Sequence, residues 1–180
     1  MRALKSNIVG RLAPKDLHRF FEMLSDVSTT CNITAEIEEN MKEKIRQVMV
    51  EEPMSLKVNE YLINKTIQLN DSLNQRTGSI IVGSIGCGKT TIWKLLKETL
   101  ERTCAMKIIT HLLSPKSMPR DHFIGYYTSN TREWVDGVFI KTCRKVVSGP
   151  ISSWHWIIVD VSQNSPSHCH INQILHIANS

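Results

Sequence analysis

An eight-residue stretch with three glycines, a lysine and a threonine carries the clearest chemistry in this sequence. It fits the pattern G-x-x-x-x-G-K-T, and its residues are Gly83, Ser84, Ile85, Gly86, Cys87, Gly88, Lys89 and Thr90. Glycines allow a loop to wrap a phosphate group with its backbone N–H groups pointing inward. Lys89 would reach the β- and γ-phosphates of a nucleotide, and the Thr90 hydroxyl would bind Mg²⁺. We therefore predict a nucleotide-binding phosphate loop that includes Thr91 at its end.

The residues on either side of this loop predict the elements that hold it. Residues 79–82 read S-I-I-V, a short segment that is mostly apolar and β-branched, which is typical of a buried strand. Residues 91–100 carry apolar side chains at helical spacing. A strand, a glycine loop and a helix in this order provide the context that a phosphate loop requires.

An apolar segment that ends in an acid is the second candidate element. Residues 154–160 read W-H-W-I-I-V-D, the pattern of a buried strand that ends in Asp160. In nucleotide hydrolases with a phosphate loop, an aspartate in this position holds the Mg²⁺ ion. We therefore predict that Thr90 and Asp160 together support the metal.

The remaining apolar patterns predict the elements around these two. A helix opens at Pro14, because proline is favoured in a first helical turn. Thr34 is expected to cap the next helix. The further predicted elements are helices at 34–50, 56–73 and 135–147 and a strand at 105–110.

Composition narrows the class of protein. The 180 residues, 41% of them hydrophobic, suit one modest globular domain. The net charge is +5, but lysines and arginines are interspersed with glutamates, so no nucleic-acid site is expected. Five cysteines lie far apart without a C-x-x-C pair, which fits a reducing compartment. No signal peptide is evident and no apolar run is long enough for a membrane span, so we expect a soluble intracellular protein.

Three blocks of the sequence together resemble the second AAA+ module of dynein heavy chains. They are the phosphate loop with its flanks at 81–93, L-S-P-K-S-M at 113–118 and S-N-T-R-E-W-V-D-G-V-F at 129–139. In that module the loop is followed by a proline–lysine loop, a T-x-E-W-x-D-G segment and a W-I-x-x-D strand. The third block is the most specific, because no general phosphate chemistry requires it.

This resemblance implies a fold, cofactors and partners. The expected fold class is α/β, a partial AAA+ subdomain with a parallel sheet and flanking helices, preceded by a helical segment. The implied cofactors are ATP or ADP and Mg²⁺. The parent protein would be a microtubule-based, minus-end-directed motor that assembles with other AAA+ modules and with dynein intermediate and light chains. Its expected location is the cytoplasm and cytoskeleton, with an axonemal, ciliary type preferred.

One departure from the family concerns catalysis. Hydrolytic AAA+ modules usually have a glutamate directly after the aspartate, where it orients the attacking water. Here that residue is Val161, and residues 161–180 contain no Asp or Glu. We therefore expect no catalytic residue in this chain, and a nucleotide that is bound rather than hydrolysed.

A second departure concerns the end of the chain, because the resemblance stops after Asp160. We predict a helical lead-in at 1–77, the N-terminal part of an AAA+ domain at 78–160 and an unrelated polar tail at 161–180. Apolar residues at 171–177 predict one or two amphipathic turns in this tail. The AAA+ strand that lies between the phosphate-loop strand and the Asp160 strand is missing. We therefore expect a truncated fragment with a gap between the two halves of its site.

Two other functions are compatible with the phosphate loop. A small P-loop kinase or a GTPase-like enzyme can place the Asp160 strand directly beside the phosphate-loop strand, so nothing would be missing. Such an enzyme needs an acceptor-binding lid with arginines or an N-K-x-D segment, and neither follows Asp160. The other alternative is a non-enzymatic interaction fragment. The absence of half of the AAA+ domain is the reason to consider it.

Overall fold

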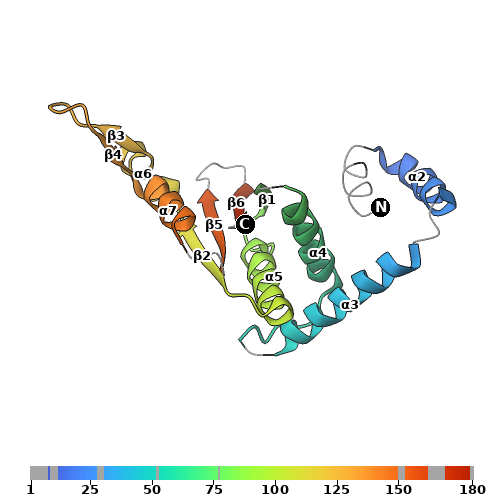
Figure 1. Ribbon diagram of the computed structural model, residues 1–180. Helices are drawn as coiled ribbons and strands as arrows, with labels where there is room; N and C mark the ends of the chain where they lie inside the picture. Colours follow the sequence, from blue (N-terminus) through green and yellow to red (C-terminus); the bar gives the residue numbers. More distant parts are fainter. Residues whose placement is uncertain are drawn as a thin grey trace. The chain divides into compact units, whose positions relative to one another are not determined.

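The computed structural model of the chain divides into two compact units, Met1–Gln75 and Arg76–Ser180 (Figure 1). It describes residues 8, 12–27, 31–51, 53–76, 78–149, 153–161 and 169–178. We call the first unit the helical unit and the second the α/β unit, and we describe each by itself.

The helical unit contains α2 (Pro14–Val27), α3 (Cys31–Val50) and α4 (Glu60–Gln75). α2 begins at Pro14, as the sequence predicts. α3 and α4 contact each other, and both bury rows of apolar side chains. These side chains are Ile45, Val48 and Met49 on α3 and Ile63, Ile67, Leu69 and Leu73 on α4. Helical spacing of apolar residues therefore identified the buried side of both helices.

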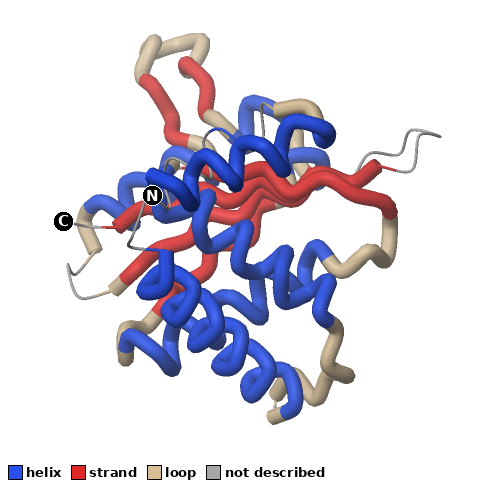
Figure 2. Tube along the Cα trace, turned by 90° about the vertical axis from the view of Figure 1, so that its right-hand side faces the viewer, coloured by secondary structure: helices blue, strands red, loops and turns tan. Residues whose placement is uncertain are grey.

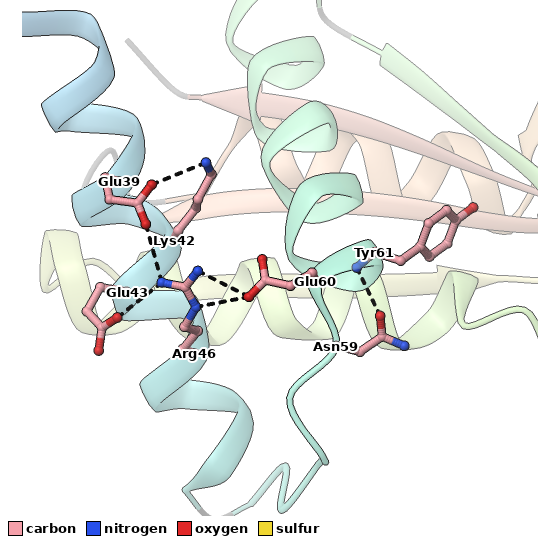
Figure 3. Close-up of polar contacts among 7 residues, drawn as sticks. All are labelled: Glu39, Lys42, Glu43, Arg46, Asn59, Glu60 and Tyr61. Atoms are coloured by element: carbon pink, nitrogen blue, oxygen red, sulfur yellow. Dashed lines mark hydrogen bonds and ion pairs between the residues drawn. The ribbon is translucent and has the colours of Figure 1, made fainter. Parts of the chain in front are cut away.

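Two helix starts differ from the prediction. α3 begins at Cys31, so Thr34 lies inside its first turn and does not cap it. α4 begins four residues later than expected, because Asn59 caps it: the Asn59 Oδ1 atom accepts a hydrogen bond from the Tyr61 N–H at 2.9 Å (Figure 3). A side-chain cap of this kind satisfies a backbone donor that has no partner within the helix.

A group of charged side chains links α3 to α4 (Figure 3). The Arg46 guanidinium donates to the Glu60 carboxylate from Nη2 at 3.1 Å and from Nε at 3.3 Å. Within α3, Arg46 also pairs with Glu39 at 3.4 Å and with Glu43 at 3.3 Å. The hydrogen bond from Lys42 lowers the pKa of Glu39, and the hydrogen bond to Glu60 raises the pKa of Arg46. The carboxylates are exposed, so each pair contributes little to stability on its own.

The α/β unit alternates strands and helices. In chain order its elements are β1 (Gly78–Ser84), α5 (Lys89–Cys104), β2 (Ile108–Leu113), the 3₁₀ turn η1 (Pro115–Ser117), α6 (Arg120–Phe123), β3 (Gly125–Tyr127), β4 (Trp134–Asp136), α7 (Val138–Val147), β5 (Trp154–Val161) and β6 (Cys169–Ala178). The predicted strand at 105–110 lies three residues later, because Ala105 adopts the left-handed conformation that ends α5.

A four-stranded sheet forms the centre of the α/β unit, with the order β1-β6-β5-β2 (Figures 1 and 2). β2 and β5 are parallel, whereas β6 is antiparallel to both β5 and β1. β1, β5 and β2 therefore all run in the same direction. The predicted α/β class with a parallel sheet and flanking helices is confirmed, and β6 is the one strand of this sheet that runs the other way.

β6 corrects two expectations about the end of the chain. The amphipathic turns predicted at 171–177 are wrong, because these residues belong to a strand. The expected gap between the phosphate-loop strand and the Asp160 strand is also wrong, because β6 pairs with β1 on one side and with β5 on the other. This order also differs from the direct neighbourhood of β1 and β5 that the kinase or GTPase-like alternative relies on.

β5 is the most deeply buried of the strands whose side-chain burial the structure describes. Residues 155–159 are all buried, which is why the segment reads as a continuous apolar run apart from His155. On one face, Ile157 and Val159 pack with Leu113 of β2 and with Val146 of α7. Figure 1 shows α5 and α7 on opposite sides of β5. Both faces are thus covered, as expected for a strand in an α/β sheet.

The most family-specific sequence block forms a hairpin and not the start of a helix. Residues 134–136, where the predicted helix at 135–147 begins, are strand β4, which pairs with β3. Gly125 has φ +134° and Gly137 lies against the backbone: an added Cβ atom on Gly137 would be 2.5 Å from the Phe123 carbonyl oxygen. Figures 1 and 2 show this hairpin projecting away from the four-stranded sheet. The two glycines allow the hairpin to close against α6.

Candidate functional site

The phosphate loop connects β1 to α5. β1 ends at Ser84 and α5 begins at Lys89, so the predicted strand, loop and helix lie in the predicted order. The prediction that this strand is buried is wrong, because β1 lies at the edge of the sheet and exposes Ile80 and Val82. Gly86 and Gly88 have φ angles of +78° and +89°. Residues with a Cβ atom rarely adopt these angles, so the two glycines provide the backbone turns that the loop needs.

Gly83 contributes in a different way, through close packing inside the loop. A Cβ atom at this position would lie 2.6 Å from the Cys87 Sγ atom. The loop folds back at this point, and the Cys87 N–H donates to the Ser84 carbonyl at 3.4 Å. The first glycine of the motif therefore leaves room for the side chain that the return of the loop places beside it.

Lys89 lies within the loop, where its side chain is held by backbone oxygens. It is only 8% exposed, and its Nζ atom donates to the Gly83 carbonyl at 3.0 Å and to the Ser84 carbonyl at 2.7 Å. The Cys87 Sγ atom lies 3.7 Å from the same Nζ. A buried cation held by two neutral carbonyls has no formal counter-charge from these partners, so the arrangement suits an anionic ligand.

The start of α5 adds further features of an anion-binding site. The first intrahelical bond after the loop runs from the Ile92 N–H to the Gly88 carbonyl at 2.9 Å. The N–H groups of the preceding turn have no partners within the helix and point toward its N-terminus, where the helix dipole favours negative charge. Thr90 is exposed and Thr91 is half-buried in this turn. Both are therefore placed where a phosphate would meet the helix.

Asp160 lies at the same edge of the sheet as the phosphate loop. β1 and β5 run in the same direction, so their carboxyl ends meet at one edge. Through β6, Gly83 is in register with His170 and Asp160 is in register with Asn172. Two strand spacings of about 4.8 Å and two residues of about 3.4 Å give a Cα separation of roughly 12 Å between Gly83 and Asp160. The sequence did not predict the strand that sets this separation.

A histidine pair lies on β2 and β5, away from the phosphate loop. The His111 Nε2 atom is 3.2 Å from the His155 Nδ1 atom, and the His155 Nε2 atom is 3.1 Å from the Ser153 hydroxyl. Burial lowers the pKa of His111, and the charges of His155 and Lys145 lower it further. The sequence does not predict this pair, because the two residues are far apart in the chain and only strand pairing brings them together.

A metal-binding cluster and a membrane-spanning helix are both absent from the part of the chain that the structure describes. No group of three or more His, Cys, Asp or Glu side chains there could hold a metal ion. Among the same residues, no helix combines the length and the apolar character needed to cross a bilayer.

Comparison with protein families gives two overlapping matches. Residues 1–90 match the family described as the hydrolytic ATP binding site of dynein motor region. Residues 78–176 match the family described as AAA domain (dynein-related subfamily). The overlap, residues 78–90, holds β1 and the phosphate loop, and the second match reaches into β6.

Individual relatives agree with these families. The chain is 33% identical over 160 residues to cytoplasmic dynein 2 heavy chain 1 of Chlamydomonas reinhardtii and 32% identical over 160 residues to the human protein of that name. It is 31% identical over 167 residues to the cytoplasmic dynein heavy chain of Drosophila melanogaster. Each comparison covers 89% of this chain, and the chain spans 4% of the length of each relative.

Proposed function

Since the chain belongs to the AAA family of dynein heavy chains, we propose that its phosphate loop binds ATP or ADP. The observation that carries this proposal is the position of Lys89, which is buried inside a loop whose glycines adopt left-handed angles at the start of a helix. Phosphate is the ligand that such a loop is shaped for. Residues 83–91 would hold the nucleotide.

The residues present also fit a magnesium ion bound together with the nucleotide. Mg²⁺ prefers oxygen ligands and is usually bound through one or two protein groups and the phosphates. The Thr90 hydroxyl is exposed at the start of α5, and Asp160 lies at the same edge of the sheet. When bound, the ion would neutralise phosphate charge, and Thr90 and Asp160 would hold it.

We propose that the nucleotide is bound and not hydrolysed at this site. Hydrolysis requires a group that orients or activates the attacking water. The residue that follows Asp160 is Val161, whose side chain neither accepts nor donates a proton. The site would then act through the presence of its nucleotide, and no residue of the chain is assigned a catalytic role.

The role of the whole protein is a proposal from the family. We propose that the parent is a minus-end-directed, microtubule-based motor of the cytoskeleton that works with other AAA+ modules and with intermediate and light chains. A ciliary location fits the similarity to cytoplasmic dynein 2 heavy chains. An axonemal type and the limits of 1–77 for the helical lead-in and 78–160 for the nucleotide-binding module stay predictions.

The nucleotide proposal is tested by measuring the affinity of the purified chain for ATP-Mg by calorimetry. Lys89→Ala removes a charge-assisted hydrogen bond, worth about 1.5–3 kcal/mol, so it should weaken binding at least tenfold. Lys94→Ala is the matched control, because Lys94 is an exposed lysine on the same helix. Equal binding by the Lys89→Ala variant and the unaltered chain, or no binding by the unaltered chain, would contradict the proposal.

The absence of turnover needs a separate measurement. Phosphate release from ATP by the unaltered chain should not exceed release by the Lys89→Ala variant under saturating nucleotide. Release that depends on Lys89 would show a working hydrolase and would overturn the assignment of a bound, unhydrolysed nucleotide.

A further inference from the structure

β6 is the only strand that pairs with β1 among the residues that the structure describes. Seven residue pairs join β1 to β6, from Gly78 opposite Leu175 to Ser84 opposite Cys169. On its other edge β6 forms eight residue pairs with β5. β5 is held by β2 as well, whereas β1 stands at the edge of the sheet. The strand that leads into the phosphate loop therefore reaches the rest of the sheet through β6.

We propose that β6 is the positioning strand of the nucleotide site. It holds the phosphate loop and Asp160 in a fixed register, so nucleotide binding depends on residues 169–178. This inference rests on the proposed nucleotide function, but the placement of β6 and its effect on β1 can be tested without a ligand.

The register explains what β6 contributes. Gly83 and Asp160 are aligned with positions 170 and 172 of one continuous strand. The separation of roughly 12 Å between the two site residues is set by the two strand spacings across β6 and by the two-residue offset along it. Direct pairing of β1 with β5 would reduce the lateral spacing from about 9.6 Å to about 4.8 Å. The pairing of β6 with both strands therefore sets how far Asp160 lies from the phosphate loop.

Removal of β6 would affect the two neighbouring strands unequally. β5 would keep its parallel partner β2 on one edge. β1 would lose its strand pairing in the sheet, and its N–H and C=O groups would be left without those hydrogen bonds. The loss therefore falls on the strand that carries the phosphate loop.

The placement of β6 is tested by disulfide formation. Cα atoms that face each other across antiparallel strands are about 4.5–5.5 Å apart, a distance that a disulfide can bridge. In a full-length chain whose Cys31, Cys87, Cys104 and Cys143 are replaced by alanine, Ser84→Cys should form a disulfide with the native Cys169 under mild oxidation. Ser79→Cys in the same background is the matched control, because Ser79 pairs with Ile174 and lies five residues before Ser84, near the start of β1.

The disulfide result distinguishes the two directions that β6 can take. Efficient bonding of Ser84→Cys, with at least tenfold less in the control, supports the antiparallel register. Efficient bonding of Ser79→Cys would place Cys169 at the other end of β1 and overturn the proposal. No bonding by either variant would also overturn it, because it would remove β6 from β1.

The effect of β6 on the site is tested with Gln173→Pro and its matched control Gln173→Ala. Gln173 lies in the middle of β6, opposite Ile80 and Val159. Proline removes a backbone N–H and does not fit a central strand, whereas alanine keeps the N–H. Hydrogen exchange in the full chain should accelerate at least tenfold at 78–84 in the proline variant and stay protected at 108–113. ATP-Mg binding should weaken at least tenfold in the proline variant only.

The outcomes separate this inference from the proposed function. Unchanged exchange at 78–84 in Gln173→Pro would overturn the positioning role, whatever the chain binds. Faster exchange at 78–84 with unchanged ATP-Mg affinity would overturn the link between β6 and the site. If the unaltered chain does not bind ATP-Mg, the nucleotide function fails, while the exchange and disulfide results still decide whether β6 holds β1.

Discussion

The helical unit and the α/β unit differ in the sequence separation of the contacts inside each of them. In the helical unit, α3 and α4 are successive helices, and the Arg46 network joins residues that are close in the sequence. In the α/β unit, β1 at the beginning pairs with β6 at the end. Contacts between neighbours form at little entropic cost, whereas long-range pairing must first close the chain. The candidate site belongs to the unit that depends on long-range pairing.

The two units should therefore differ in which substitutions destabilise them. The carboxylates that pair with Arg46 in the helical unit are exposed, so single changes at these ion pairs should be tolerated. The α/β unit contains glycines against backbone atoms, a buried histidine and a lysine inside a loop. All four tryptophans, at positions 93, 134, 154 and 156, lie in the α/β unit. Tryptophan fluorescence therefore follows this unit alone.

The largest expected effect comes from close packing in the α/β unit. Gly137→Ala would place a Cβ atom 2.5 Å from backbone atoms of Phe123 and Ile124, which have no rotamer with which to move away. We expect a loss of about 3 kcal/mol in unfolding free energy, the upper range for an overpacked site. Urea unfolding followed by tryptophan fluorescence measures it.

Gly86→Ala is the matched control for this prediction. Gly86 has φ +78°, but an added Cβ atom would meet nothing within 4 Å. Only backbone strain remains, about 1–2 kcal/mol for a residue in the left-handed region. Equal losses of unfolding free energy in Gly137→Ala and Gly86→Ala would contradict the prediction, because they would show that close packing at Gly137 costs no more than backbone strain at Gly86.

A pH-dependent loss of stability is the next effect, and it arises from the His111–His155 pair. The folded state lowers the pKa of His111 through burial and through the nearby His155 and Lys145. As the pH falls below about 6.5, the unfolded chain takes up the proton first, so stability is present above that pH and decreases below it. Urea midpoints from tryptophan fluorescence should therefore fall between pH 7.5 and pH 5.5.

Two histidine variants test whether His111 causes the change of the urea midpoint with pH. His111→Gln should flatten the pH dependence, whereas His122→Gln, which changes an exposed histidine on α6, should leave it as it is. An unchanged slope in the His111→Gln variant would show that other groups cause it.

The smallest effect is expected in the helical unit. Arg46→Ala removes contacts with Glu39, Glu43 and Glu60, yet exposed ion pairs contribute only about 0.2–1 kcal/mol each. Hydrogen exchange in α3 and α4 should accelerate only a few fold, and less so in high salt, which screens exposed charges. Gln47→Ala, an exposed change on the same helix, provides the baseline. If Arg46→Ala lowered the unfolding free energy as much as Gly137→Ala does, the two units would not differ in their sensitivity to single substitutions.

The sequence predicted those parts of the fold that depend on neighbouring residues. Helical spacing identified α2, α3 and α5, and the glycines and Lys89 identified the phosphate loop, because the chemistry lies within eight residues. Val135 and Asp136 belong to β4 but were predicted as part of the following helix, since Val135 continues the apolar spacing of α7. β6 was missed because H-I-N-Q-I-L-H-I has no regular alternation and its partners are distant in the chain. The register between the loop and Asp160 depends on those distant partners, so it could not be predicted from the sequence.

Thermal unfolding with and without nucleotide tests whether the phosphate loop binds ATP-Mg. A ligand at one hundred times its Kd stabilises the folded state by about 2.7 kcal/mol, so saturating ATP-Mg should raise the unfolding temperature reported by tryptophan fluorescence by several degrees. In the Lys89→Ala variant, a Kd raised tenfold or more leaves at most about 1.4 kcal/mol of this stabilisation, so its unfolding temperature should rise by half as much or less at the same concentration. Lys94→Ala should respond like the unaltered chain. An unfolding temperature that ATP-Mg leaves unchanged, or raises equally in the Lys89→Ala variant, would contradict a nucleotide bound in the phosphate loop.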